Sequence, residues 1–151
     1  MKIGILSDTH GMLRPEVHSA LKGCDVILHG GDINKQSVLD QLNEIAPVNV
    51  VRGNNDKEWA EHIPAFLDFW LGTLHVYMTH KKKDLPDDLS SYDLVIIGHS
   101  HKYSMSEVGS TIVLNPGSCG PRRFDQAITL AIADYDGYTI SISRVDIPHH
   151  K

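Results

Sequence analysis

The sequence has too few cysteines for a disulfide framework or a thiolate metal site, because only Cys24 and Cys119 occur in 151 residues. We expect both to be ordinary buried or half-buried thiols. A long apolar run is also missing, since the run from Ile3 to Leu6 is interrupted by Gly4. We therefore expect neither a signal peptide nor a membrane-spanning segment, and a cytoplasmic location.

Basic residues are scarce as well. The 14 Lys and Arg residues are outnumbered by 19 Asp and Glu, which gives a formal net charge of -5. This balance argues against an extended nucleic-acid surface and against binding to an anionic membrane, because both need a positive footprint. The length and the lack of a linker-like tract predict one domain over residues 1–151. What the chain has in excess is histidine, with ten residues.

The apolar pattern predicts an α/β fold. Strands are predicted over 2–7, 25–29 and 48–52, alternating with helices over 15–21 and 35–45, and a third helix over 57–62. Further strands are predicted over 74–79, 94–97, 111–114, 127–133 and 139–145, the last two joined by a hairpin turn at Asp136-Gly137. We expect a parallel first half and antiparallel strands later, arranged as two central mixed β-sheets packed as a sandwich and flanked by helices.

Polar residues follow the carboxyl end of five of these strands. The groups are Asp8 with His10, Gly30-Gly31-Asp32, Gly53-Asn54-Asn55-Asp56, His80, and Gly98-His99-Ser100-His101. In open α/β sheets ligands bind at this edge, because the loops there converge. The five strand ends are therefore predicted to build one pocket.

The predicted pocket offers two carboxylates, one or more amides and four imidazoles. Oxygen and imidazole ligands suit Mn²⁺, Fe²⁺ or Zn²⁺ better than Ca²⁺ or Cu(I). Seven ligands are too many for one tetrahedral ion, but suit two ions that share Asp32 and lie about 3.5 to 4 Å apart, as in phosphoryl chemistry. Two divalent ions, two carboxylates and one hydroxide leave a net charge of about +1. Such a pocket should attract a small phosphate ester.

In this order, and together with Asn115-Pro116-Gly117-Ser118, these groups resemble the calcineurin-like metallophosphoesterases, and more narrowly their small bacterial and archaeal phosphodiesterase branch. The resemblance implies a dinuclear phosphodiesterase in which a metal-bridging hydroxide attacks phosphorus in line. It places Asp8, His10, Asp32 and His101 on one metal ion, and Asp32, Asn54, His80 and His99 on the other. We expect Mn²⁺ as the native ion, with Ni²⁺, Fe²⁺ or Zn²⁺ as alternatives.

Two departures from the family pattern concern substrate and catalysis. Many members carry a histidine, thought to protonate the leaving group, where this chain has Asn55, and asparagine cannot act as a general acid. Asn55 and Asp56 stay the candidate catalytic residues, and slow turnover is expected for esters with strongly basic leaving groups. A lysine run, residues 81–83, follows His80. Candidate substrate contacts are Asn55, Lys81 and Arg122, with Arg123 beside it.

The main alternative is a binding protein. Some relatives keep the fold as a scaffold in membrane-trafficking complexes after losing ligands, whereas this chain keeps all seven, which favours catalysis. The other histidines of the folded part lack a partner pattern and are predicted to be surface or core residues, with His29 placed to support the pocket; they are His18, His29, His62 and His75. The sequence does not indicate an oligomeric state.

Overall fold

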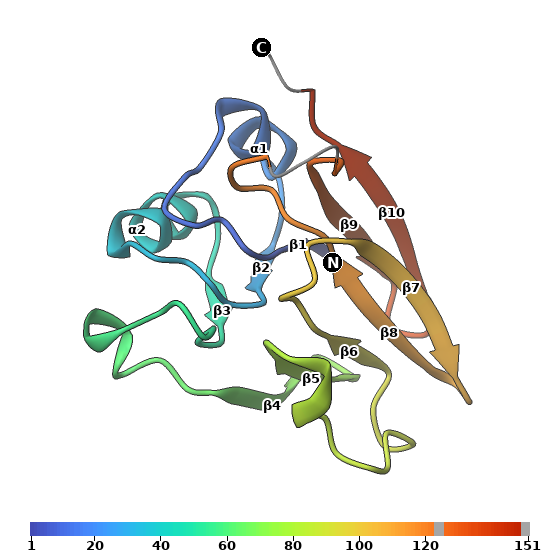
Figure 1. Ribbon diagram of the computed structural model, residues 1–151. Helices are drawn as coiled ribbons and strands as arrows, with labels where there is room; N and C mark the ends of the chain where they lie inside the picture. The colour runs from blue at the N-terminus through green and yellow to red at the C-terminus, as the bar shows by residue number, and fades with distance from the viewer. Residues whose placement is uncertain (123–125, 149–151) are drawn as a thin grey trace.

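A computed structural model describes residues 1–122 and 126–148 and contains two five-stranded sheets (Figure 1). The first sheet has the order β10-β9-β1-β2-β3. Its strands are β1 (Lys2–Leu6), β2 (Val26–His29), β3 (Val48–Val50), β9 (Thr129–Tyr135) and β10 (Ile140–Asp146). The three N-terminal strands are parallel, while β9 runs antiparallel to both β1 and β10. The predicted parallel first half is therefore confirmed.

The second sheet has the order β4-β5-β6-β8-β7. Its strands are β4 (Phe66–Leu71), β5 (Leu74–Thr79), β6 (Leu94–Ile96), β7 (Tyr103–Val108) and β8 (Thr111–Pro116). Strands β5, β6 and β8 are parallel, and only the hairpins β4–β5 and β7–β8 are antiparallel. The prediction of antiparallel strands in the second half is wrong for these three, because the segments between them are long enough to cross back to the same end of the sheet.

Helices cover the outer face of the first sheet. Helices α1 (Pro15–Ala20) and α2 (Gln36–Ile45) pack there, and Val17, Leu39 and Leu42 join a core cluster with Leu6 and Ile27. The third predicted helix, over 57–62, is a single 3-10 turn, η1 (Glu58–Ala60), which ends shortly before Pro64. Within residues 1–122 and 126–148, no helix has the length and apolar character that crossing a membrane requires.

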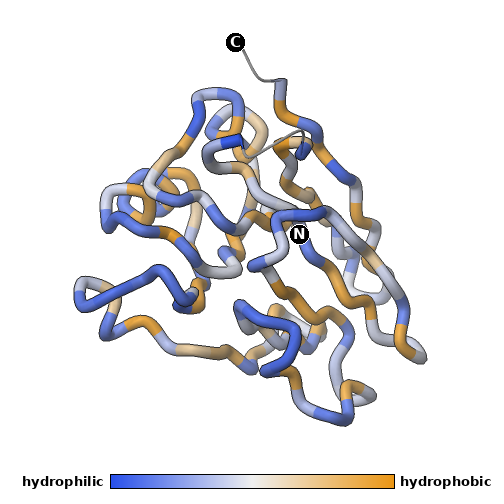
Figure 2. The backbone as a smooth tube through the Cα atoms, viewed as in Figure 1, coloured by the Kyte–Doolittle hydropathy of each residue, from blue (hydrophilic) through white to orange (hydrophobic). Residues whose placement is uncertain are grey.

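The main core lies between the two sheets. Ile3, Ile5 and Leu28 of the first sheet pack there with residues such as Met78 and Ile96 of the second. Figure 2 shows hydrophobic positions recurring along the strands of both sheets. Alternate residues of buried strands point to opposite faces, so each central strand serves the inner core and an outer one. The two-sheet sandwich predicted from the sequence is confirmed.

The outer face of the second sheet has a different cover. Tyr77, Val95 and Val113 form a small cluster with Leu85 and Leu89. The segment between β5 and β6 supplies this cover, and its regular structure is the 3-10 turn η2 (Lys82–Asp84). The expected flanking helices thus lie on the first sheet, while a loop takes their place on the second.

Two strands were missed in the sequence, and both are edge strands. β7 is almost fully exposed and lacks the apolar pattern of a core strand. β4 is apolar at every position except Asp68, although its residues are exposed or half-buried, so its sequence did carry a strand signal. A local signal exists in the turns that follow them. Gly72 and Gly109 have φ of 60° and 63° at the first position of two-residue hairpin loops, the place where such loops favour glycine.

A buried histidine ties the ends of β1 and β2 together. Nδ1 of His29 accepts the N–H of Gly31 at 3.0 Å, so Nε2 carries the proton and donates to Oγ1 of Thr9 at 3.0 Å. The side chain is fully buried. Burial lowers the pKa of His29 to about 4, although the negative charges of Asp8 and Asp56 raise it in part. His29 therefore supports the loops of the site, as the sequence suggested.

This lowered pKa predicts a loss of stability in mild acid. Between the ordinary pKa of 6.5 and the folded value of about 4, the unfolded chain binds a proton that folded His29 does not. The free energy of unfolding should fall by about 3 kcal/mol as the pH falls through this window. Urea unfolding from about pH 7 to pH 4.5 in chelator should show a clearly flatter pH dependence for His29→Gln. Parallel curves for the two proteins would contradict this assignment.

Candidate metal centre

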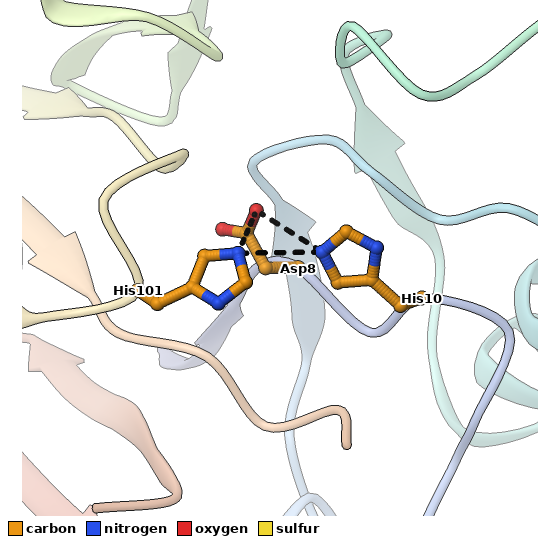
Figure 3. Close-up of side chains that lie close together, drawn as sticks. All are labelled: Asp8, His10 and His101. Atoms are coloured by element: carbon orange, nitrogen blue, oxygen red, sulfur yellow. Dashed lines mark hydrogen bonds and ion pairs between the residues drawn. The ribbon is translucent and has the colours of Figure 1, made fainter. Parts of the chain in front are cut away.

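Loops from both sheets bring the predicted ligands to one place. Asp8 and His10 follow β1, and His101 follows β6 of the other sheet. Nε2 of His101 lies 3.3 Å from Oδ1 of Asp8 and 3.3 Å from Nε2 of His10, and Nε2 of His10 lies 3.8 Å from the same oxygen. Figure 3 shows both imidazoles turned toward the carboxylate from opposite sides. These three ligand atoms form a group that could hold one ion.

A second group of three lies beside the first. Its members are Asp32 after β2, His80 after β5 and His99 after β6, and their ligand atoms lie within 4.8 Å of one another. Nε2 of His80 is 3.2 Å from Oδ2 of Asp32, and the rings of His80 and His99 are 5.3 Å apart. This group could hold a second ion. These six residues are among the seven ligands that the family resemblance implied, which placed Asp32 in both sets and added Asn54 to the second.

The two groups are contiguous. Nε2 of His10, in the first group, lies 3.8 Å from Oδ2 of Asp32 in the second. Nε2 of His80, in the second group, lies 3.8 Å from Oδ1 of Asp8 in the first. A carboxylate oxygen of Asp32 is thus within reach of both sets, which is the position that a bridging ligand needs.

Two buried polar atoms at the centre of this cluster have no hydrogen-bond partner, namely Oδ1 of Asp8 and Nε2 of His80. Leaving such atoms unpaired is costly, and native structures seldom do so. Nδ1 of His80 donates to the carbonyl of Gly30 at 2.8 Å, so in the neutral ring the lone pair of Nε2 faces Asp8 and Asp32. A cation bound between these atoms would satisfy both, and the residues present therefore fit a metal.

The carboxylate of Asp32 is held in its charged form. Burial raises the pKa of Asp32, but the close approach of Nε2 of His80, 3.2 Å from Oδ2, and the N–H of Asn55, 2.9 Å from Oδ1, lower it to about 2. Burial lowers the pKa of His80, but the close approach of Asp32 and the charge of Asp8 outweigh burial, so the pKa of His80 is raised. The cluster thus already contains negative charge that attracts a proton, as it would attract a metal ion.

The backbone is strained at the candidate ligands. Among the described residues other than glycine, positive φ occurs at Asp8, His10, Asp32, Asn34, His99 and His101, with values from 48° to 75°. Five of these six are candidate ligands, and Asn34 contacts His10. Left-handed backbone at such residues costs about 1–3 kcal/mol each and collects at functional sites. Hydrogen bonds hold this strained backbone in place. For example, Oδ2 of Asp8 accepts hydrogen bonds from Oγ of Ser7 at 2.7 Å and from the N–H of His99 at 3.1 Å.

Two glycines make room for the carboxylates. A Cβ added at Gly53 would collide with Oδ1 and the backbone nitrogen of Asp32. A Cβ added at Gly98 would lie 2.9 Å from Oδ2 of Asp8 and collide with Oγ of Ser7. At Gly53 and Gly98, glycine is therefore required by close approach to a carboxylate.

The end of β8 and the segment after it support the loops of the site, a role that the sequence did not reveal. Nδ2 of the buried Asn115 donates to the carbonyl of Gly98 at 3.1 Å and to Oγ of Ser100 at 3.0 Å. Oγ of Ser118 donates to the carbonyl of Asp8 at 3.0 Å. These bonds fix the loops that carry His99, His101 and Asp8. The sequence signal was the motif Asn115-Pro116-Gly117-Ser118 of the family resemblance, to which no role was assigned.

The candidate catalytic residues Asp56 and Asn55 form hydrogen bonds within the loops of the site. The buried carboxylate of Asp56 accepts the backbone N–H groups of Ile33, Asn34 and Gly53 at 2.8 to 3.2 Å. Its oxygens therefore join the loops after β2 and β3, and the catalytic role expected for Asp56 stays a prediction. Asn55 donates its N–H and its Nδ2, at 2.9 and 3.3 Å, to Asp32.

The remaining predicted site residues lie at the rim. Asn54 and Lys81 line one pocket together with His80. Arg122 is exposed beside His101 in a shallow depression, and its Nε donates to the carbonyl of Gln126 at 3.4 Å. Arg123 lies outside the described residues.

Comparison with known proteins agrees with this geometry. Residues 1–137 match the calcineurin-like phosphoesterase superfamily domain. A probable metallophosphoesterase of Methanothermobacter thermautotrophicus is 32% identical over 98% of this chain and 95% of its own length. A phosphodiesterase of Methanocaldococcus jannaschii is 30% identical over 79% of this chain and 84% of its own.

A solved structure shares the fold at lower identity. Vps29 of Chaetomium thermophilum superimposes with a TM-score of 0.79 and 19% identity, covering 97% of each chain. This likeness bears on the fold alone. The match over residues 1–137 and the two relatives above bear on the family: the chain belongs to the calcineurin-like phosphoesterase superfamily.

Proposed function

We propose that the protein is a phosphodiesterase that uses two divalent metal ions. The observation that carries the proposal is the pair of contiguous three-ligand groups, whose unpaired Oδ1 of Asp8 and Nε2 of His80 a bound cation would satisfy. Membership of the superfamily and the activity named for the relative of Methanocaldococcus jannaschii support it.

Each ion would be held by residues of both sheets. Asp8, His10 and His101 would hold one ion, and His80, His99 and Asn54 the other, with Asp32 shared between them. Manganese is the ion we propose, because carboxylate, amide and imidazole ligands suit it. The bound ions would supply a hydroxide nucleophile near neutral pH, for in-line attack on phosphorus, and stabilise charge in the transition state.

Asn55 limits the range of substrates. Its amide donates to Asp32 and has no acidic proton to give to a leaving group. Esters whose leaving groups are stable anions, such as p-nitrophenolate, should therefore react faster than alkyl esters. Replacement of Asn55 by His should speed alkyl esters most, and a gain confined to aryl esters would contradict this reading.

A scaffold role is the alternative, because Vps29 shares the fold. The two candidate ligand groups favour catalysis, since a scaffold has no need of strained ligands around unpaired polar atoms. Two equivalents of bound metal without turnover of any phosphate ester would favour the scaffold.

Metal content and turnover test the proposal together. Protein purified without chelator and loaded with Mn²⁺ should contain about two ions per chain and hydrolyse bis(p-nitrophenyl) phosphate. His101→Ala should lower the metal content and reduce kcat/KM about 100-fold or more, because a ligand of one ion is lost. The matched control is His62→Ala, an exposed histidine outside both groups, which should leave both quantities unchanged. Full metal content and full activity in His101→Ala would contradict the proposal.

Asn34 should set the orientation of His10. Its amide lies 3.3 Å from Nδ1 of His10, and its Oδ1 is buried without a partner. A half-turn of the amide would let Nδ1–H of His10 donate to Oδ1, which leaves the lone pair of Nε2 for a metal ion.

Asn34 has φ of 71°, so Asn34→Gly removes the amide without adding strain. This variant should bind Mn²⁺ about 10 to 100-fold more weakly in a metal titration, which needs no turnover. Asn34→Asp keeps an acceptor and should bind at least as tightly as the natural chain. Equal affinities for Asn34→Gly and the natural chain would exclude the role.

A further inference from the structure

A pocket of about 330 Å³ opens beside the second ligand group. His80 and Asn54 line it, and Phe66, Tyr77 and Lys83 are among its other lining residues. The volume lies in the range of small-molecule sites. Because the pocket adjoins a candidate ligand, a molecule bound there would lie next to any phosphate held at the metal centre.

One wall of the pocket is aromatic. Phe66 begins β4, and its ring stacks on that of Tyr77 in β5, with centroids 5.7 Å apart and planes 16° from parallel. Tyr77 is 8% exposed, whereas Phe66 is 56% exposed. The outer phenyl ring is therefore supported from behind, and much of its surface faces solvent at the pocket. An exposed, supported ring is a stacking surface for a planar group.

The pocket is also positively charged. Arg52, Lys81 and Lys83 line it, against a single acid, Asp84, which leaves three positive charges and one negative. Within residues 1–122 and 126–148, none of these three cations forms an ion pair. The chain as a whole carries a net charge of -5, so the net positive charge of the pocket contrasts with the net negative charge of the protein. Unpaired cations around an aromatic wall match an aromatic ligand that carries its own negative charge.

We propose that this pocket binds the organic group that stays on phosphorus during hydrolysis, and that this group is an aromatic ring with a second phosphate, the chemistry of a nucleotide. Phe66 stacks on the ring, and Arg52, Lys81 and Lys83 meet the second phosphate. The inference rests on the proposed phosphodiesterase function and adds the substrate class. A lysine run that is merely solvated would give no such preference.

Three diesters with the same leaving group test the inference on manganese-loaded protein. They are methyl p-nitrophenyl phosphate, the p-nitrophenyl ester of thymidine 5′-phosphate, and the same nucleotide ester with a 3′-phosphate. The release of p-nitrophenolate reports all three reactions. The value of kcat/KM should rise about tenfold from methyl to thymidine through stacking. It should rise about fivefold more with the 3′-phosphate, a gain that salt reduces.

Variants separate the two contributions. Phe66→Ala should abolish the gain from methyl to thymidine, and Phe66→Tyr, which keeps a ring, should retain it. Lys83→Ala should reduce only the gain from the 3′-phosphate. Trp70→Ala is the matched control, because Trp70 lies on the same strand, is 61% exposed and stacks on His75 outside the pocket. Lys22→Ala is the control for loss of one positive charge.

The outcomes distinguish failure of the pocket inference from failure of the proposed phosphodiesterase function. If none of the three esters is hydrolysed, the proposed function fails. If the methyl ester is hydrolysed but the nucleotide esters are no better, the inference about the pocket is overturned and the proposed function stands. An equal loss on all three esters in Phe66→Ala would also overturn it, because the ring would then act on the shared leaving group or on folding.

Discussion

The buried carboxylate of Asp8 is the group on which the site depends. One oxygen, Oδ2, accepts hydrogen bonds from Ser7 and His99, and so joins the loop after β1 to the loop after β6 in the other sheet. The other oxygen, Oδ1, is unpaired and lies within 3.8 Å of Nε2 atoms of His10, His80 and His101. A fully buried charge in this position is stable only with a counter-charge, which a metal ion would provide.

The rest of the structure keeps that carboxylate and Asp32 in place. Parallel strands in both sheets end at the same edge, so their loops meet there. Buried polar groups then join loop to loop: His29 and Asp56 connect the turns of the first sheet, and Asn115 holds the loop after β6. These bonds support the left-handed backbone at the candidate ligands, which would otherwise relax. The strain therefore preorganises the ligands before any ion binds.

Much of the fold and nearly all of the candidate ligands could be predicted from the sequence. The alternation of apolar and amphipathic segments gave the parallel strands β1, β2 and β3 with their helices, because buried parallel strands are continuous apolar runs. The shared pocket followed from polar residues at strand ends, and the division of its ligands between two ions followed from the family resemblance. Edge strand β7 has no apolar pattern that predicts it, whereas β4 is apolar and could have been predicted. The segment 57–62, predicted as a helix, forms one turn. The role of Asp56 and the pocket at Phe66 depend on contacts between distant segments, which no local pattern contains.

The central claim is that Asp8 and Asp32 hold a pair of cations within one cluster of loops. Anomalous diffraction from crystals grown with Mn²⁺ tests it most directly. We predict two anomalous peaks about 3.5 to 4 Å apart, one beside Asp8, His10 and His101, the other beside His80 and His99, with Asp32 between them. The absence of any peak at these residues, or a single peak bound elsewhere on the protein, would contradict the account.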